Sequence, residues 1–188
     1  MKFDAIIIGT GQAGPSLAAS LAKNKKKVAI IEKGHLGGTC VNVGCTPTKA
    51  YVASARRAFI TENSKELGIE INGDVHVNLE TIKKRKDKIV TDSREGLKSM
   101  FSSNENITHI EGKARFVSNH KLKVEGKTYE ADKIYINVGR KPRIPEGFEA
   151  VDYLTNESIL ELKSIPEHLI IVGGGYKGLE FGQMFSRF

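Results

Sequence analysis

The feature that most constrains the fold of this chain is a pair of short apolar runs near the N-terminus, joined through glycines and a helix. Ala5 to Ile8 is uniformly apolar and stops at a glycine, which is typical of a strand buried on both faces, and Val28 to Ile31 repeats the pattern. Between them, Pro15 opens a segment rich in helix formers, Ser16 to Lys23. A strand, a helix and a strand within about 30 residues predict a βαβ unit with a right-handed crossover.

The link from the first strand to the helix has the sequence Gly-Thr-Gly-Gln-Ala-Gly, residues 9–14. Gly9 allows a tight turn, Gly11 lets a pyrophosphate approach the backbone, and Gly14 lets the helix pack closely on the sheet. The helix N-terminus offers N–H groups and partial positive charge to phosphates. Glu32 ends the second strand, where an acid receives ribose hydroxyls. A purely structural glycine turn is the alternative, but the flanking strands and Glu32 favour dinucleotide binding.

The rest of the chain predicts an α/β fold with an antiparallel part. Helices are expected over 47–60, 79–101 and 155–162. Alternating apolar residues from Ile107 to Val138, with turns at Asn119 and Glu125-Gly126, predict an antiparallel meander. After a proline-bearing connection over 140–145, the opening pattern returns. Leu169 to Val172 predicts a buried strand, and a second glycine pattern, Gly173 to Gly178, follows it at once.

Composition excludes several classes of protein. The 188 residues carry 29 Lys and Arg against 22 Asp and Glu, for a formal charge of +7, but the basic clusters lie beside acids and match no nucleic-acid fold. Nucleic-acid binding therefore ranks below the other hypotheses for this chain, and we expect no such partner. No apolar run suits a membrane span or a signal peptide, so we expect no membrane partner and a cytoplasmic location. Two cysteines are too few for a secreted disulfide scaffold.

Both cysteines lie in one segment, Gly37 to Lys49, with four residues between them. In a regular helix they would project about 140° apart, so Gly44 is expected to permit a bent first turn. Cys45 precedes Pro47, a residue suited to a first helical turn, and the helix end with nearby Lys49 favours the thiolate form. Two buried small hydrophobes or half of a metal site are the alternatives. We expect no metal here, because there is no Cys-x-x-Cys and no second cysteine pair.

The Gly37 to Lys49 segment resembles the redox-disulfide signature of the class I pyridine nucleotide-disulfide oxidoreductases. The two glycine patterns stand where that family has its FAD and NAD(P) fingerprints. The sequence around Val41-Asn42-Val43 and Thr46-Pro47-Thr48 is most similar to the mercuric reductase-like and dihydrolipoamide dehydrogenase-like branches. The resemblance implies a Rossmann-type FAD-binding domain over 1–145, with a redox-disulfide helix over 40–60. It also implies a connection over 146–166 and the truncated start of a second Rossmann NAD(P)-binding domain over 167–188.

The resemblance also implies roles for single residues. Cys40 resembles the thiol that meets the substrate, Cys45 the thiol beside the flavin, and Lys49 with Glu180 the charged pair near flavin N5. Tyr176 resembles the aromatic gate over the flavin, although Lys177 stands where the family usually has an apolar residue. The implied cofactor-binding residues are Gly9, Gly11, Gln12, Ala13, Gly14, Glu32, Lys33, Gly38, Thr39, Lys49, Ala114, Gly139, Gly173, Gly175, Tyr176 and Gly178.

The activity implied by the resemblance is electron transfer from NAD(P)H through FAD to a Cys40–Cys45 disulfide and on to a small disulfide, dithiol or metal-ion substrate. The family is homodimeric, and its dimerisation domain has no counterpart here, so we expect this chain to be an N-terminal portion. The competing hypothesis is a truncated FAD-binding fragment without catalytic competence.

Overall fold

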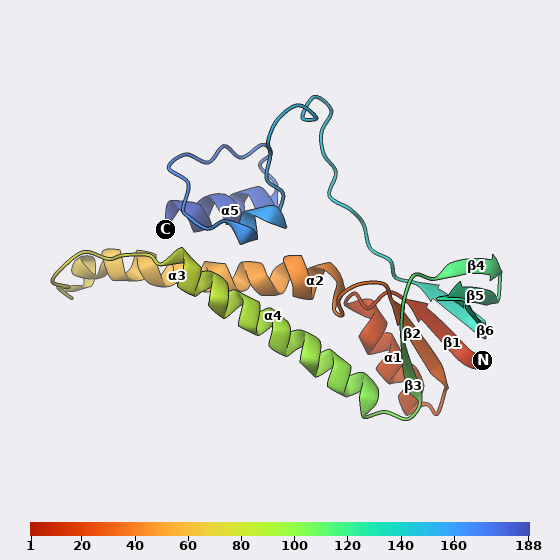
Figure 1. Ribbon diagram of the computed structural model, residues 1–188. Coiled ribbons are helices and arrows are strands. Elements are labelled where there is room, and N and C mark those ends of the chain that lie inside the picture. The colour runs from red at the N-terminus through yellow and green to blue at the C-terminus, as the bar shows by residue number, and fades with distance from the viewer. The chain divides into compact units, whose positions relative to one another are not determined.

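The two N-terminal apolar runs form neighbouring parallel strands inside a six-stranded sheet. The computed structural model describes residues 1–188. β1 (Lys2–Ile8) pairs in parallel with β2 (Val28–Glu32) on one side and with β6 (Lys127–Ile136) on the other. β3 (Ile107–Glu111) adds to β2 in parallel, so the strand order is β3-β2-β1-β6-β5-β4 (Figure 1). The predicted βαβ unit is confirmed, because α1 (Ala13–Lys23) connects β1 to β2.

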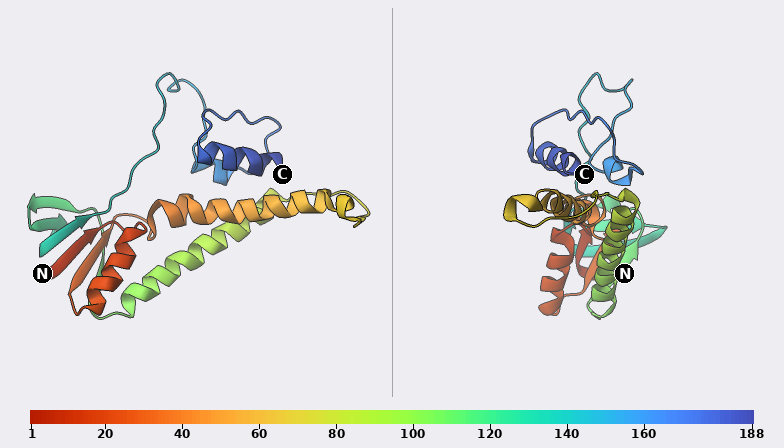
Figure 2. Two further views of the ribbon diagram at one scale, coloured as in Figure 1. Left: turned by 180° about the vertical axis from the view of Figure 1, so that it is seen from behind. Right: turned by 90° about the vertical axis from the view of Figure 1, so that its left-hand side faces the viewer.

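Each face of the parallel strands has its own apolar cluster. On one face, Ala18 and Ala22 of α1 pack with Ile7, Val28 and Ile30 of the sheet, and small alanines let the helix lie close to the strands (Figure 2). The second face buries Ile6 and Ile31 together with residues of the antiparallel strands. α1 begins at Ala13 and not at Pro15, since a proline is tolerated anywhere in the first turn, where no helical N–H is needed.

The expected meander over 107–138 is only partly right. β4 (Arg115–Ser118), β5 (Lys121–Val124) and β6 are antiparallel neighbours, and Glu125 and Gly126 turn between β5 and β6 with positive φ. However, β3 pairs in parallel with β2, and β6 also pairs in parallel with β1. Alternation of apolar residues identifies a strand but does not reveal the direction of its partner, so this correction required the tertiary structure.

The chain divides into two compact units, each built from two stretches of sequence. The first unit comprises residues 1–42 and 91–143, and the second comprises 43–90 and 144–188. The sheet belongs to the first unit. The predicted domain limits at 145 and 166 stay a prediction.

The second unit is built around helices. It contains α3 (Cys45–Glu62), the 3-10 helix η1 (Ser64–Leu67), the first half of α4 (Leu79–Ser102), the 3-10 helix η2 (Ser158–Glu161) and α5 (Tyr176–Ser186). α5 runs beside α3 (Figure 2), and Tyr51 and Ala55 of α3 share a core with Phe181 and Met184 of α5. None of the helices is long and apolar enough to cross a membrane.

The expected strand over 169–172 is absent. These residues form no ladder with any strand, and Ile170 is 90% exposed. A strand needs a neighbour to receive its backbone hydrogen bonds, and all six strands of this chain belong to the sheet of the first unit. The expected short helix near 155–162 is confirmed as η2. The Thr155 hydroxyl accepts hydrogen bonds from the N–H groups of Glu157 and Ser158 where this helix begins.

A buried lysine fixes η2 against α4 within the second unit. Lys86 is 3% exposed, and its Nζ lies 2.7 Å from Glu161 Oε1 and 2.6 Å from Asp87 Oδ1. Lys83 Nζ lies 2.8 Å from the same two carboxylates. Burial raises the pKa of Glu161, but the hydrogen bonds from Lys83 and Lys86 outweigh burial and hold that pKa below its ordinary value. Protonation of Glu161 would therefore leave Asp87 as the one carboxylate paired with Lys83 and Lys86.

We predict that Glu161→Gln lowers the free energy of unfolding by about 1 kcal/mol, because buried Lys86 keeps a single carboxylate partner. The loss stays small because water screens the half-exposed Glu161. A carboxyl group whose pKa is lowered by folding stabilises the protein at pH values above its ordinary pKa. This stabilisation is lost as the pH falls through the lowered pKa of the folded state. The variant lacks this group, so its stability should fall less steeply below about pH 4. Urea unfolding at several pH values measures both effects, and exposed Glu157→Gln is the control. Equal effects of the two substitutions would contradict a stabilising role for the charges that surround Lys86.

Candidate functional site

The first glycine fingerprint forms a loop between β1 and α1 in which backbone packs directly on backbone. Gly9 has φ +101°, and a Cβ there would lie 2.2 Å from the carbonyl oxygen of Asn137, which follows β6. A Cβ on Gly14 would lie 2.4 Å from the carbonyl oxygen of Gly9. Real Cβ atoms do not approach so closely, so these positions require glycine. The loop therefore presents bare backbone at the N-terminus of α1, as a site for phosphate groups needs.

Glu32 lies at the end of β2 and is tied to this loop. Its Oε2 accepts hydrogen bonds from the backbone N–H of Thr10 at 2.9 Å and from the Thr10 hydroxyl at 2.7 Å. Its Oε1 accepts from the N–H groups of Lys33 and Gly34. Burial raises the pKa of Glu32, but these hydrogen bonds outweigh burial and hold the pKa below its ordinary value. An ionised carboxylate is thus fixed beside the fingerprint, where the sequence predicted an acid.

Thr10 also joins the fingerprint to the cysteine segment. Its hydroxyl accepts a hydrogen bond of 3.1 Å from the N–H of Gly37 while it donates to Glu32. A Cβ on Gly38 would lie 2.7 Å from the Cα of Gly11, so the two glycines allow the segments to touch. Sequence reasoning missed Thr10, whose position in the fingerprint accepts any residue. Its role shows only in the structure, where it is 1% exposed and bonds to both Glu32 and Gly37.

Asn42 holds the turn that leads into α2 (Gly38–Val43), the short helix that carries Cys40. The Asn42 Nδ2 donates to the carbonyl oxygens of Leu36 at 2.9 Å and Gly38 at 2.8 Å, and its Oδ1 accepts from Arg94 Nε on α4. Cys40 itself is half-buried. Sequence reasoning did not single out Arg94, because it is one of many basic residues on an amphipathic helix.

In the sequence, the second unit begins at Val43, and Cys45 is the first residue of α3. The expected bend at Gly44 is confirmed, since Gly44 has φ −129° and ψ −118° and separates α2 from α3. The single redox helix expected over 40–60 is therefore two helices. Cys45 is exposed, while Pro47 and Thr48 in the first turn of α3 are buried.

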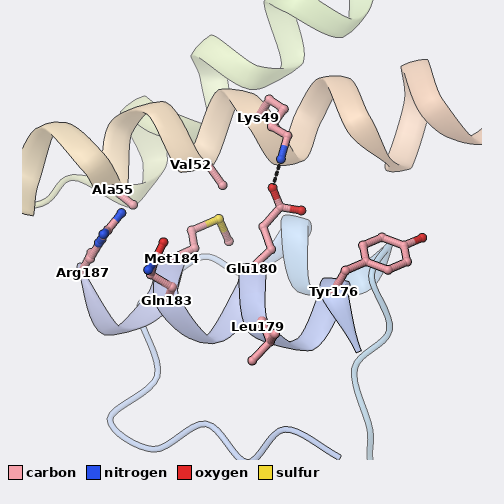
Figure 3. Close-up of a pocket in the computed structure, with 9 residues that line it drawn as sticks. All are labelled: Lys49, Val52, Ala55, Tyr176, Leu179, Glu180, Gln183, Met184 and Arg187. Carbon is pink, nitrogen blue, oxygen red and sulfur yellow. Dashed lines mark hydrogen bonds and ion pairs between the residues drawn. The ribbon is translucent and has the colours of Figure 1, made fainter. Parts of the chain in front are cut away.

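A cavity of about 470 Å³ lies between α3 and α5 of the second unit (Figure 3). Lys49 of α3 forms an ion pair with Glu180 of α5, the pairing that the family resemblance implied. Tyr176 is 78% exposed at the start of α5 and lines the same cavity. The other lining residues are Val52, Ala55, Leu179, Gln183, Met184 and Arg187.

The second fingerprint repeats the local geometry of the first. Gly173 has φ +106°, and a Cβ on Gly178 would lie 2.3 Å from the Gly173 carbonyl oxygen, which matches the relation of Gly14 to Gly9. Gly175 precedes α5 as its N-cap. Lys177, which departs from the family pattern, donates a 3.4 Å hydrogen bond to Asn156 Oδ1.

The predicted site residues fall into two groups. Lys49, Gly173, Gly175, Tyr176, Gly178 and Glu180 belong to the second unit together with Cys45. The first unit contains Cys40 and the residues predicted at the FAD site, namely Gly9, Gly11, Gln12, Ala13, Gly14, Glu32, Lys33, Gly38, Thr39, Ala114 and Gly139. Ala114 packs against the apolar cluster of the sheet, and Gly139 turns away from the end of β6 with φ +69°. Their binding roles stay predictions.

We predict that Gly14→Ala lowers the free energy of unfolding by about 1–3 kcal/mol, because its Cβ would overlap the backbone of Gly9. Gly96→Ala is the matched control, since Gly96 lies inside α4 and an added methyl group there would meet nothing within 4 Å. We expect this control substitution to stabilise the chain by about 0.5–1 kcal/mol. Urea unfolding of both variants measures the difference. Shifts of the same sign and size would contradict the close contact.

Comparison with known proteins agrees with this geometry. The family model described as pyridine nucleotide-disulphide oxidoreductase matches residues 3–188. Mercuric reductase of Lysinibacillus sphaericus is 35% identical over 98% of this chain and 34% of its own length. Dihydrolipoyl dehydrogenase of Mycoplasma pneumoniae is 34% identical over 99% of this chain and 42% of its own length.

Among solved structures, the HOCl-induced flavoprotein disulfide reductase RclA from Escherichia coli superposes with a TM-score of 0.83 and 36% identity, over 98% of this chain and 40% of that chain. The chain therefore spans well under half the length of these relatives. A match over nearly every residue, on a fold with the same arrangement, establishes that this chain belongs to the pyridine nucleotide-disulphide oxidoreductase family.

Proposed function

We propose that this chain provides the FAD-binding and redox-cysteine portion of an NAD(P)H-dependent oxidoreductase. The observation that carries the proposal is the contact between the fingerprint loop and the cysteine segment. Gly37 N–H bonds to Thr10, and Gly38 lies against Gly11, only two residues before Cys40. A dinucleotide bound at the fingerprint would thus have the redox segment as its neighbour.

The residues present fit FAD. Three glycines leave bare backbone at the start of α1, and Glu32 stands beside them as an ionised hydrogen-bond acceptor for ribose hydroxyls. FAD, when bound, supplies two-electron redox chemistry between NAD(P)H and the cysteine pair. The protein holds the cofactor through its diphosphate and ribose, and it positions the thiols.

Each cysteine has a separate role in this proposal. Cys45 is exposed in the first turn of α3, and we assign it the contact with the flavin. The Cys40 thiolate attacks the substrate. As the Cys40–Cys45 disulfide forms, two electrons pass from the cysteine pair to the substrate, which is reduced. Lys49 and Glu180, which form an ion pair, would be the charged pair near the flavin, and Tyr176 would be the aromatic gate that covers the flavin until nicotinamide displaces it.

The named relatives indicate a class of substrate for this proposal and not a single compound. One is a mercuric reductase, another a dihydrolipoyl dehydrogenase, and RclA has been solved as a Cu(II) complex. A dithiol that cycles with a disulfide reduces either a small disulfide or a soft metal ion. We therefore propose a small disulfide or a metal ion as the oxidising substrate.

The glycine pattern at Gly173 to Gly178 supports a second dinucleotide site for NAD(P)H. It shares the tight glycine contact of the first fingerprint and leads into the N-terminus of α5 in the same way. We propose that residues 167–188 open an NAD(P)-binding domain that follows an FAD-binding domain over 1–145.

We predict that the full-length protein, loaded with FAD and reduced by two electrons, develops a long-wavelength charge-transfer absorbance band. Cys45→Ser should abolish the band, because the thiolate beside the flavin is lost. Cys40→Ser is the matched control, and it should show the band even before reduction, because Cys45 then has no disulfide partner. Absorbance spectroscopy of the three proteins measures this. A band that persists in Cys45→Ser would contradict the assignment.

We predict that the 188-residue chain, purified with added FAD, retains yellow flavin in a 1:1 ratio and shows little NADPH oxidation. The fingerprint and Glu32, which we assign to the diphosphate and ribose of FAD, are both part of this chain. Absorbance of the washed protein and a coupled NADPH assay measure the two properties. A colourless protein would contradict FAD binding, and rapid NADPH oxidation would remove the hypothesis of a fragment without catalytic competence.

A further inference from the structure

Asn137, the residue directly after β6, forms hydrogen bonds with the fingerprint loop. Its backbone N–H donates to the carbonyl oxygen of Ile8 at 2.8 Å, which extends the β1–β6 pairing by one bond. Its side-chain Nδ2 then donates to the carbonyl oxygens of Gly9 at 3.3 Å and Gly11 at 3.2 Å. One amide group thus holds two peptide groups of the loop.

The fit between Asn137 and the glycines is close. A Cβ on Gly14 would lie 3.0 Å from the Asn137 Nδ2, and one on Gly11 would lie 3.5 Å from it. The carbonyl oxygen of Asn137 is also the atom that a Cβ on Gly9 would meet. All three fingerprint glycines therefore face this one residue: its side-chain amide lies beside Gly11 and Gly14, and its backbone carbonyl lies beside Gly9.

These hydrogen bonds fix the direction of the loop's N–H groups. The chain has no cis peptide bond, and in a trans peptide the C=O and the following N–H point in opposite directions. With the carbonyls of Gly9 and Gly11 turned toward Asn137, the N–H groups of Thr10 and Gln12 point away from it. The Thr10 N–H donates to Glu32, and the Gln12 N–H belongs to the N-cap residue of α1, at a helix end whose N–H groups favour an anion.

We propose that Asn137 is a positioning residue for dinucleotide binding: its side-chain amide orients two peptide groups of the fingerprint so that the Thr10 N–H meets Glu32 and the Gln12 N–H faces the diphosphate. The proposal rests on the proposed FAD site. An aspartate at this position has the same shape, but its carboxylate would face two carbonyl oxygens and could donate to neither. A protonated aspartic acid regains one O–H donor.

The test measures FAD affinity of the full chain by quenching of flavin fluorescence, at pH 8 and at pH 5. At pH 8, Asn137→Asp should weaken binding by about ten- to a hundredfold, the effect of two lost hydrogen bonds and one added charge. At pH 5, the ratio of variant to wild-type affinity should recover several-fold as the carboxyl group protonates. Asn137→Ala should weaken binding at both pH values without recovery.

Asn24→Asp is the matched control, because the Asn24 Nδ2 also donates to a backbone carbonyl, that of Ser20, but at the exposed end of α1. It should leave FAD affinity unchanged at either pH. Wild-type affinity in Asn137→Asp at pH 8, or a loss that does not respond to pH, would overturn the positioning role. If Asn137→Asp does not fold, Asn137→Ala decides, and unchanged affinity in that variant would likewise overturn the role. Absence of FAD binding by the wild-type chain would overturn the proposed function together with this inference.

Discussion

The structure of the first unit depends on a contact between two backbones at the ends of β1 and β6. Gly9 can lie against the Asn137 carbonyl only because it has no side chain, and Gly14 lies against Gly9 for the same reason. These contacts let α1 start close to the sheet, so that Ala18 and Ala22 reach the apolar face of β1 and β2. A side chain at either glycine would separate the helix from the strands. The same absence of side chains leaves the N–H groups at the start of α1 accessible to phosphate.

Polar contacts extend this arrangement to the cysteine segment. The Thr10 hydroxyl stands between Glu32 and Gly37, so the end of β2, the fingerprint and the start of the redox segment share one buried hydrogen-bonding group. Asn42 then fixes the turn before α2 through backbone carbonyls, and Arg94 fixes Asn42. A chain of neutral and charged hydrogen bonds thus sets the position of Cys40 relative to the loop that we assign to FAD. Such networks hold side chains more firmly than apolar packing alone, because each donor and acceptor has a required direction.

Much of the fold could be predicted from local sequence, because its elements have strong local signals. The runs that became β1 and β2, the helices α1, α3 and α4, and the bend at Gly44 followed from apolar spacing, proline and glycine. The parallel pairing of β3 and β6 could not be predicted, since alternation says nothing about a partner far along the chain. The expected strand over 169–172 failed for a related reason, because a strand forms only where another strand accepts its hydrogen bonds.

For the candidate site, the sequence by itself determined which residue types were present and where glycine was required. The fingerprints, Glu32 and the cysteine pair were found in this way, since their chemistry is tied to fixed spacing, whereas the Lys49–Glu180 couple followed from the resemblance to a known family. Only the tertiary structure revealed Thr10, Arg94 and Asn137 as their supports. Asn137 is far from Gly9 in sequence, and it reaches the loop only because β6 inserts beside β1. Motifs name the residues that a ligand touches, whereas the residues that orient those motifs come from whichever strands and helices the fold places next to them.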